Sequence, residues 1–145
     1  MADGNQNAEV LELEQTMWDE LVEAAWADFP FEVCGFLGLH ADGTATHFPI
    51  RNAERSMTYY LMDAKQMLRA IRTIEDDGLG LVIYHSHTHT RAYPSATDIR
   101  HAAYPEATYL IITLQDHDKP AMRAFDIVDG KVTEKSVVVR DAQPA

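Results

Sequence analysis

Two histidines two positions apart, His85 and His87, are followed by Asp98, and these three residues are the group in this chain best suited to chemistry. Imidazole nitrogens and carboxylate oxygens bind zinc, and three protein ligands leave a fourth position for water, as in catalytic zinc sites. The apolar run LGLVIY before the pair predicts a strand, and residues i and i+2 of a strand point to the same face. The pattern therefore predicts a catalytic metal site with these three side chains as ligands.

The segment Ser95-Ala96-Thr97-Asp98 has a second interpretation. It matches the capping box that starts a helix, in which Ser caps the first turn and the acidic residue answers it. The two interpretations are compatible, because a capped helix start would hold Asp98 rigidly where a ligand must lie. His89 follows His87 by two positions and is a possible competing ligand, but we interpret it as a loop residue. We expect the remaining histidines to be surface or core residues: His40, His47, His101 and His117.

A metal-dependent hydrolase also needs a base that moves protons, and Glu32 is the candidate. It opens the apolar segment FEVCGFLGL (31–39), which predicts a strand inside the sheet beside the histidine strand. The alternative, a solvated strand end, stays open on these residues alone. Cys34 in the same segment could be read as a nucleophile, but a buried strand thiol is more often inert packing.

Composition sets limits on the function. A chain of 145 residues with 46% hydrophobic and 24% charged residues is long enough for one globular domain with a core. A net charge of -11 argues against nucleic acid as a ligand and leaves a basic protein partner open. The single cysteine excludes a disulfide framework and fits a reducing compartment. No signal peptide or membrane-spanning run is visible, so we expect a cytoplasmic protein that does not bind membranes.

Hydrophobic periodicity and turn residues predict an α/β fold, a single domain with a mixed β-sheet flanked by helices. We expect polar tails at 1–8, which we take as flexible, and at 140–145, with the domain between them at 9–139. The predicted helices cover about 15–28, 63–77 and 95–103, and the predicted strands cover 10–13, 31–39, 44–50, 81–84, 107–114, 121–128 and 131–139.

The motif as a whole resembles that of the JAMM (MPN+) metalloproteases. In that family the His-x-His pair is followed by Ser and Asp at the spacing found here, and a distant upstream Glu completes the set. Bacterial members carry that Glu in a Pro-x-Glu-x-Cys-Gly context, which Pro30-Phe31-Glu32-Val33-Cys34-Gly35 matches position by position. The resemblance implies the JAMM/MPN fold, which is related to that of cytidine deaminases, and a Zn²⁺ cofactor.

Roles carried over by this resemblance assign His85, His87 and Asp98 as zinc ligands. Glu32 would move the proton from water to the departing amine, and the Ser95 hydroxyl would stabilise the oxyanion. The segments Asn52-Ala53-Glu54-Arg55-Ser56 and Ala92-Tyr93-Pro94-Ser95 are similar to those of the short bacterial members. That similarity implies hydrolysis after the C-terminal glycine of a ubiquitin-like sulfur-carrier protein, with release of cysteine.

Two alternatives to this function stay open, and a third is excluded. Members of the family also act as isopeptidases that remove a ubiquitin-like modifier from lysines of target proteins. A second alternative is a non-catalytic MPN scaffold, although such scaffolds typically lose the His pair or the Asp, which this chain keeps. A zinc deaminase would need a Pro-Cys-x-x-Cys segment, and the single cysteine excludes it. The oligomeric state and the scissile bond itself are not determined by the sequence.

Overall fold

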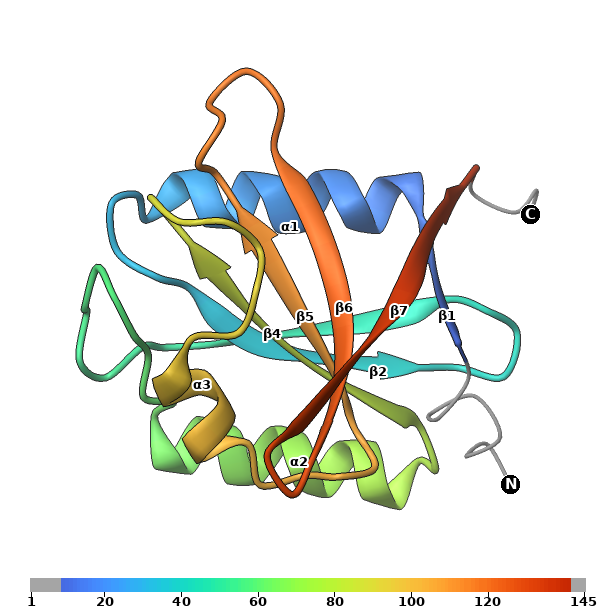
Figure 1. Ribbon diagram of the computed structural model, residues 1–145. Helices are drawn as coiled ribbons and strands as arrows, with labels where there is room; N and C mark the ends of the chain where they lie inside the picture. Colours follow the sequence, from blue (N-terminus) through green and yellow to red (C-terminus); the bar gives the residue numbers. More distant parts are fainter. Residues whose placement is uncertain (1–8, 142–145) are drawn as a thin grey trace.

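The computed structural model describes residues 9–141 and contains, within that range, one seven-stranded mixed sheet with three helices (Figure 1). The strand order across the sheet is β1-β7-β6-β5-β4-β2-β3. The strands are β1 (Val10–Glu14), β2 (Cys34–Leu39), β3 (Ala45–Ile50), β4 (Gly80–His87), β5 (Thr108–Thr113), β6 (Ala121–Val128) and β7 (Lys131–Arg140), and the helices are α1 (Gln15–Ala27), α2 (Ala64–Asp76) and α3 (Ala96–His101).

The sheet has a hydrophobic core on each face. Helix α1 lies across one face, and α2 and α3 lie on the other (Figure 1). On β4, Val82 and Tyr84 pack in the core on the α1 face, while Ile83 packs in the core on the α2 face. Because side chains alternate along a strand, His85 and His87 emerge on the face of α2 and α3, and Ser86 points the other way. The alternation of this one strand therefore aims both imidazoles toward the same region.

The predicted fold class is confirmed, and most elements lie within a few residues of their predicted bounds. Strand β2 lies between β3 and β4, so the prediction that it neighbours the histidine strand is also correct. Strand β4 is longer than predicted, and both histidines lie among its last three residues. Helix α3 is shorter, and β7 continues to Arg140.

The prediction that Glu32 opens a strand is wrong, because β2 begins only at Cys34. Two hydrogen bonds explain the late start. The amide of Glu32 donates to the carbonyl of Ser56 at 2.9 Å, and the amide of Val33 donates to the hydroxyl oxygen of Ser86 at 2.9 Å. These donors are used by a loop and a side chain, so they are not available for the β-ladder.

The parallel pairing of β1 with β7, at the far edge of the sheet from β3, joins the two ends of the described chain. Sequence periodicity predicted both strands but not this pairing. Of the expected tails at 1–8 and 140–145, residues 1–8 and 142–145 lie outside the described residues, and the domain limits stay a prediction. Within residues 9–141 no helix is long and apolar enough to cross a bilayer.

Strand β2 approaches its neighbours most closely at Gly35. A Cβ atom there would lie 2.6 Å from the carbonyl oxygen of Phe48 and 2.7 Å from the ring of Tyr84. The Tyr84 hydroxyl is 2.6 Å from Nε2 of His47, so the ring is held in place from its far end. Glycine at this position therefore allows β2 to pack against the strand that carries the histidines.

We predict that Gly35→Ala lowers the free energy of unfolding by about 2 kcal/mol, the range typical of overpacking against atoms that cannot move. Gly38→Ala is the matched control on the same strand, because the one atom its Cβ would approach closer than 3.3 Å is the flexible end of Leu79, at 2.7 Å. Urea denaturation of both variants measures the difference. Equal losses of stability would contradict the assigned contact.

Candidate metal centre

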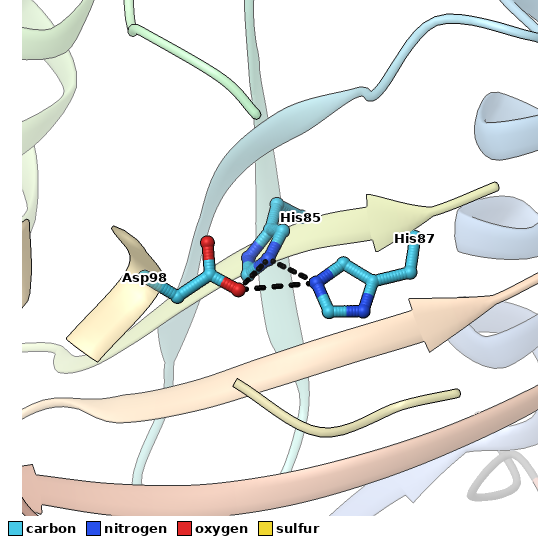
Figure 2. Close-up of side chains that lie close together, drawn as sticks. All are labelled: His85, His87 and Asp98. Carbon is cyan, nitrogen blue, oxygen red and sulfur yellow. Dashed lines mark hydrogen bonds and ion pairs between the residues drawn. The ribbon is translucent and has the colours of Figure 1, made fainter. Parts of the chain in front are cut away.

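The three predicted ligands meet at one point on the α2 and α3 face of the sheet (Figure 2). Nε2 of His85 lies 3.1 Å from Nε2 of His87, and each of these nitrogens lies 3.1 Å from Oδ2 of Asp98. Both histidines come from β4, and Asp98 comes from the first turn of α3. Ligands about 2.0–2.1 Å from a tetrahedral zinc ion are about 3.3 Å apart, so the spacing of this triangle fits that ion.

The second ring nitrogen of His87 indicates which proton that imidazole carries. Its Nδ1 lies 2.8 Å from the carbonyl oxygen of Arg91, which can only accept, so Nδ1 carries the proton. In the neutral imidazole Nε2 then presents a lone pair, and it faces the carboxylate oxygen of Asp98, which is also an acceptor. Two acceptors that converge in a buried site need a positive charge between them, which either a proton on Nε2 of His87 or a bound cation supplies.

Electrostatics in the cluster follow from burial and from the carboxylate. Burial raises the pKa of Asp98, but hydrogen bonds from His85 and His87 outweigh it and hold the pKa well below its ordinary value. For His85, burial dominates and lowers the pKa. For His87, burial also lowers the pKa, but the hydrogen bonds to Asp98 and to the Arg91 carbonyl produce a net rise. Asp98 is thus ionised, and His85 is held toward the neutral form in which imidazole binds metal.

Ser95 and Asp98 form the capping box that the sequence predicts. The Ser95 hydroxyl oxygen accepts the amide proton of Asp98 at 3.0 Å, and the Ser95 amide donates to Oδ2 of Asp98 at 2.9 Å. Oδ2 is the same oxygen that faces both histidines. The cap therefore fixes the ligand atom itself, and the hydroxyl proton of Ser95 stays available to a further acceptor.

Glu32 is buried, with 3% of its surface exposed, and lies close enough to His87 and Asp98 for their charges to affect it. Burial is the main cause that raises its pKa to about 8; the charge of Asp98 adds to the rise, and that of His87 opposes it. Its Oε1 has no hydrogen-bond partner among residues 9–141. A buried carboxyl with an unpaired oxygen and a pKa near neutrality suits a group that exchanges protons.

Ser86 and Asn52 hold Glu32 in place, although the sequence does not predict either as a site residue. Ser86, whose side chain lies on the opposite face from the ligands, accepts the Val33 amide, and its own amide donates to the Val33 carbonyl at 3.0 Å. The buried Asn52 donates from Nδ2 to the carbonyl of Glu32 at 3.0 Å and also ties down the loop 53–61. The sequence offers a signal for Ser86, because it lies between the two histidines of the motif. It offers none for Asn52, because an Asn in a loop indicates only a turn.

Tyr60 contacts the cluster through its ring. The ring stacks on His85 with centroids 4.6 Å apart and planes inclined by 28°. Metal-binding histidines usually donate their second ring N–H to an acceptor that fixes the ring. His87 does so through Arg91, but Nδ1 of His85 has no hydrogen-bond partner in the described chain. The stacked ring of Tyr60 is therefore the contact that orients His85.

The other candidates lie apart from the cluster. His89 is exposed, its Nδ1 lies 2.9 Å from the Thr88 hydroxyl, and it is not one of the grouped ligands. Cys34 is buried and donates to the carbonyl of Ile50 at 3.4 Å, and burial raises the pKa of its thiol to about 12. A thiol with a raised pKa stays protonated at neutral pH and is a poor nucleophile. This argues against the interpretation of Cys34 as the nucleophile of a cysteine hydrolase.

We predict that Tyr60→Leu weakens Zn²⁺ binding by roughly ten-fold or more, because His85 loses the contact that orients its ring. Tyr60→Phe keeps the ring and restores affinity to within about three-fold of the wild type. Competition with a chromogenic chelator measures both affinities. Tyr59→Leu is the control at the exposed neighbouring position, and a loss as large as that of Tyr60→Leu would contradict the assigned contact.

A second prediction concerns the stability of the zinc-free protein. Between its ordinary pKa of 4.5 and about 8, folded Glu32 keeps a proton that the unfolded chain has lost. Its contribution to the free energy of unfolding therefore falls as pH rises through that window, by at most about 1.4 kcal/mol per pH unit. We expect Glu32→Gln to gain stability relative to wild type from pH 5 to pH 8, measured by urea denaturation with chelator present. A difference that does not change with pH would contradict the burial effect.

Comparisons with known proteins agree with this geometry. The family described as prokaryotic homologs of the JAB domain matches residues 14–128. The chain is 41% identical over 133 residues to the CysO-cysteine peptidase of Mycobacterium tuberculosis, covering 90% of this chain and 91% of that protein. It is 41% identical over 124 residues to the desampylase of Haloferax volcanii, covering 81% and 84%.

Among solved structures, a protein from Desulfitobacterium hafniense superposes with a TM-score of 0.78 at 30% identity, covering 92% of this chain and 94% of that one. A protein from Salinibacter ruber, 23% identical with a TM-score of 0.62 and the same coverage, shares the fold. The matched segment contains Glu32 and the whole His-His-Asp cluster. The chain therefore belongs to the family of prokaryotic homologs of the JAB domain and is a hydrolase of that family.

Proposed function

We propose that this protein hydrolyses the amide bond after the C-terminal glycine of a ubiquitin-like sulfur-carrier protein and releases cysteine. The observation that carries the proposal is the triangle of His85, His87 and Asp98 beside a buried carboxyl with a raised pKa. The mycobacterial relative, named CysO-cysteine peptidase, supports cysteine as the leaving group. The alternative of cleaving modifiers from lysines finds support in the relative named desampylase.

The donor set fits zinc, which we propose as the cofactor held by His85, His87 and Asp98. Two neutral imidazoles and one carboxylate, with a fourth position free, are a common ligand set of zinc hydrolases. A zinc ion held there would supply Lewis acidity, which lowers the pKa of a bound water and polarises a carbonyl. Near such a charge the pKa of the Glu32 carboxyl would fall, which favours the ionised base at neutral pH.

Glu32 then acts in both halves of the hydrolysis. Its carboxylate removes a proton from the attacking water as the new C–O bond forms. The same proton passes to the amine nitrogen as the C–N bond breaks, so the carboxylate is regenerated. The unpaired Oε1 and the tether of its backbone to Asn52 and Ser56 support this role, because the carboxyl is free while its chain is fixed.

Ser95 stabilises the negative charge that develops on the carbonyl oxygen. Its hydroxyl oxygen accepts the Asp98 amide proton, so its own proton can point to the substrate. A donor aimed at the oxyanion is worth about 3 kcal/mol in the barrier in other hydrolases. The single cysteine of the chain fits a reducing compartment, and we place the enzyme in the cytoplasm, in a route of cysteine biosynthesis.

The decisive experiment offers the zinc-loaded enzyme two substrates, a carrier protein ending in Gly-Gly-Cys and a carrier joined through its terminal glycine to a lysine side chain. We expect cleavage of the first, with cysteine and a carrier ending in glycine identified by mass spectrometry. Glu32→Gln should reduce kcat by about 10² or more while zinc content stays stoichiometric.

Three outcomes count against parts of the proposal. Cleavage of the lysine conjugate alone rejects cysteine release and keeps the hydrolytic mechanism. Unchanged turnover in Glu32→Gln rejects the assigned base. A protein that binds the carrier but cleaves neither substrate when loaded with zinc is the non-catalytic scaffold.

A further inference from the structure

An apolar cavity of about 300 Å³ opens beside Asp98, between α2, α3 and the loop 51–63. Tyr59, Leu61, Met67 and Tyr104 line it, and Phe36 and Ile83 from the sheet also contribute to its wall. No part of the chemistry described above uses this cavity. We name it the α2–α3 pocket.

The pocket is continuous with the metal cluster. Asp98 belongs to both, and Tyr60, which stacks on His85, is part of the pocket wall. The described residues that line the pocket do not include Glu32, His87 or Ser95. The leaving amine must reach Glu32 to receive its proton, and Glu32 does not line the pocket. We therefore assign the pocket to the acyl side of the scissile bond.

We propose that the α2–α3 pocket binds an apolar side chain of the carrier protein's C-terminal tail, at the third or fourth residue from the scissile bond. This inference rests on the proposed function. The two terminal glycines present no side chain, and an extended chain advances about 3.3 Å per residue. The first side chain of the tail therefore arises roughly 7 Å before the scissile carbonyl, beyond the metal ligands.

The lining decides which side chains fit. Aromatic and aliphatic groups predominate, and apart from the tyrosine hydroxyls the titratable groups of the lining are Asp98 and His101 of α3. A volume of about 300 Å³ holds one Leu, Ile, Met or Phe side chain, whereas an acidic side chain would lose its hydration and face the like charge of Asp98. Leu61 and Tyr59 of the lining are 54% and 37% exposed, so a side chain bound in the pocket would cover apolar surface of both.

Two sets of variants test the pocket. The first changes the third and fourth residues of a Gly-Gly-Cys carrier, each in turn, to Leu, Phe, Ala or Asp. We expect kcat/KM to be roughly ten- to a hundred-fold higher for Leu or Phe than for Ala or Asp at one of the two positions, chiefly through KM.

The second set changes the enzyme. Ala64 is exposed in the first turn of α2 and lines the pocket, so Ala64→Phe fills the cavity without entering the core. It should abolish the preference for the apolar tail and leave zinc content unchanged. Leu68→Phe is the matched control, because Leu68 is 56% exposed on the same helix and lies outside the lining. Met67→Ala, which enlarges the cavity, should shift the preference from Leu toward Phe and serves as a second variant.

A binding measurement separates this inference from the proposed function. Fluorescent tail peptides ending in Gly-Gly, with Leu or Ala at the preferred position, are titrated into the Glu32→Gln protein. Tighter binding of the Leu peptide, lost in Ala64→Phe and kept in Leu68→Phe, supports the pocket even if no carrier is cleaved. Equal binding of the two peptides, or equal cleavage of all tails by an active enzyme, overturns the pocket assignment and leaves the hydrolysis standing.

Discussion

The close approach of two imidazole nitrogens to one carboxylate oxygen in a buried space is the constraint on which this structure depends. Nε2 of His85, Nε2 of His87 and Oδ2 of Asp98 are all 3.1 Å apart, so a positive charge, from a proton or from a bound cation, must hold them together. The fold holds them there by rigid means. One strand supplies both imidazoles, a helix cap supplies the carboxylate, and the carbonyl of Arg91 sets the tautomer of His87. Each of these contacts fixes the position of the nitrogen or oxygen atom that faces the centre of the triangle.

The same sheet also separates the tasks of the site. Side chains on one face of β4 form the proposed cation site, and Ser86 on the opposite face holds the segment that carries Glu32. Strand β4 thus positions both the proposed ligands and the proposed base, from its opposite faces. This arrangement leaves the Glu32 carboxyl free of hydrogen bonds at Oε1 while its backbone is immobile, which is the state that a proton carrier needs.

Much of the fold and the cluster could be predicted from the sequence because the signals are local. The His-x-His pair on a strand and the Ser-x-x-Asp cap each lie within a few residues, so strand alternation and helix capping rules place them. Contacts between distant segments could not be predicted in this way. The parallel pairing of β1 with β7, the stacking of Tyr60 on His85 and the hydrogen bond from Asn52 to Glu32 arise only when the chain folds. The late start of β2 has the same origin, because Ser56 and Ser86 take the donors that a strand would use.

Helix α3 has only six residues, and none of them is buried. The ligand Asp98 is therefore carried by the element with the smallest share in the hydrophobic core. Short segments with little buried surface open locally at a lower free energy than the whole domain. If Asp98 binds the proposed cation, binding would order this segment, and by linkage the ordering would strengthen cation binding. The exchange rate of the α3 amide hydrogens would then report how much of the protein carries the cation.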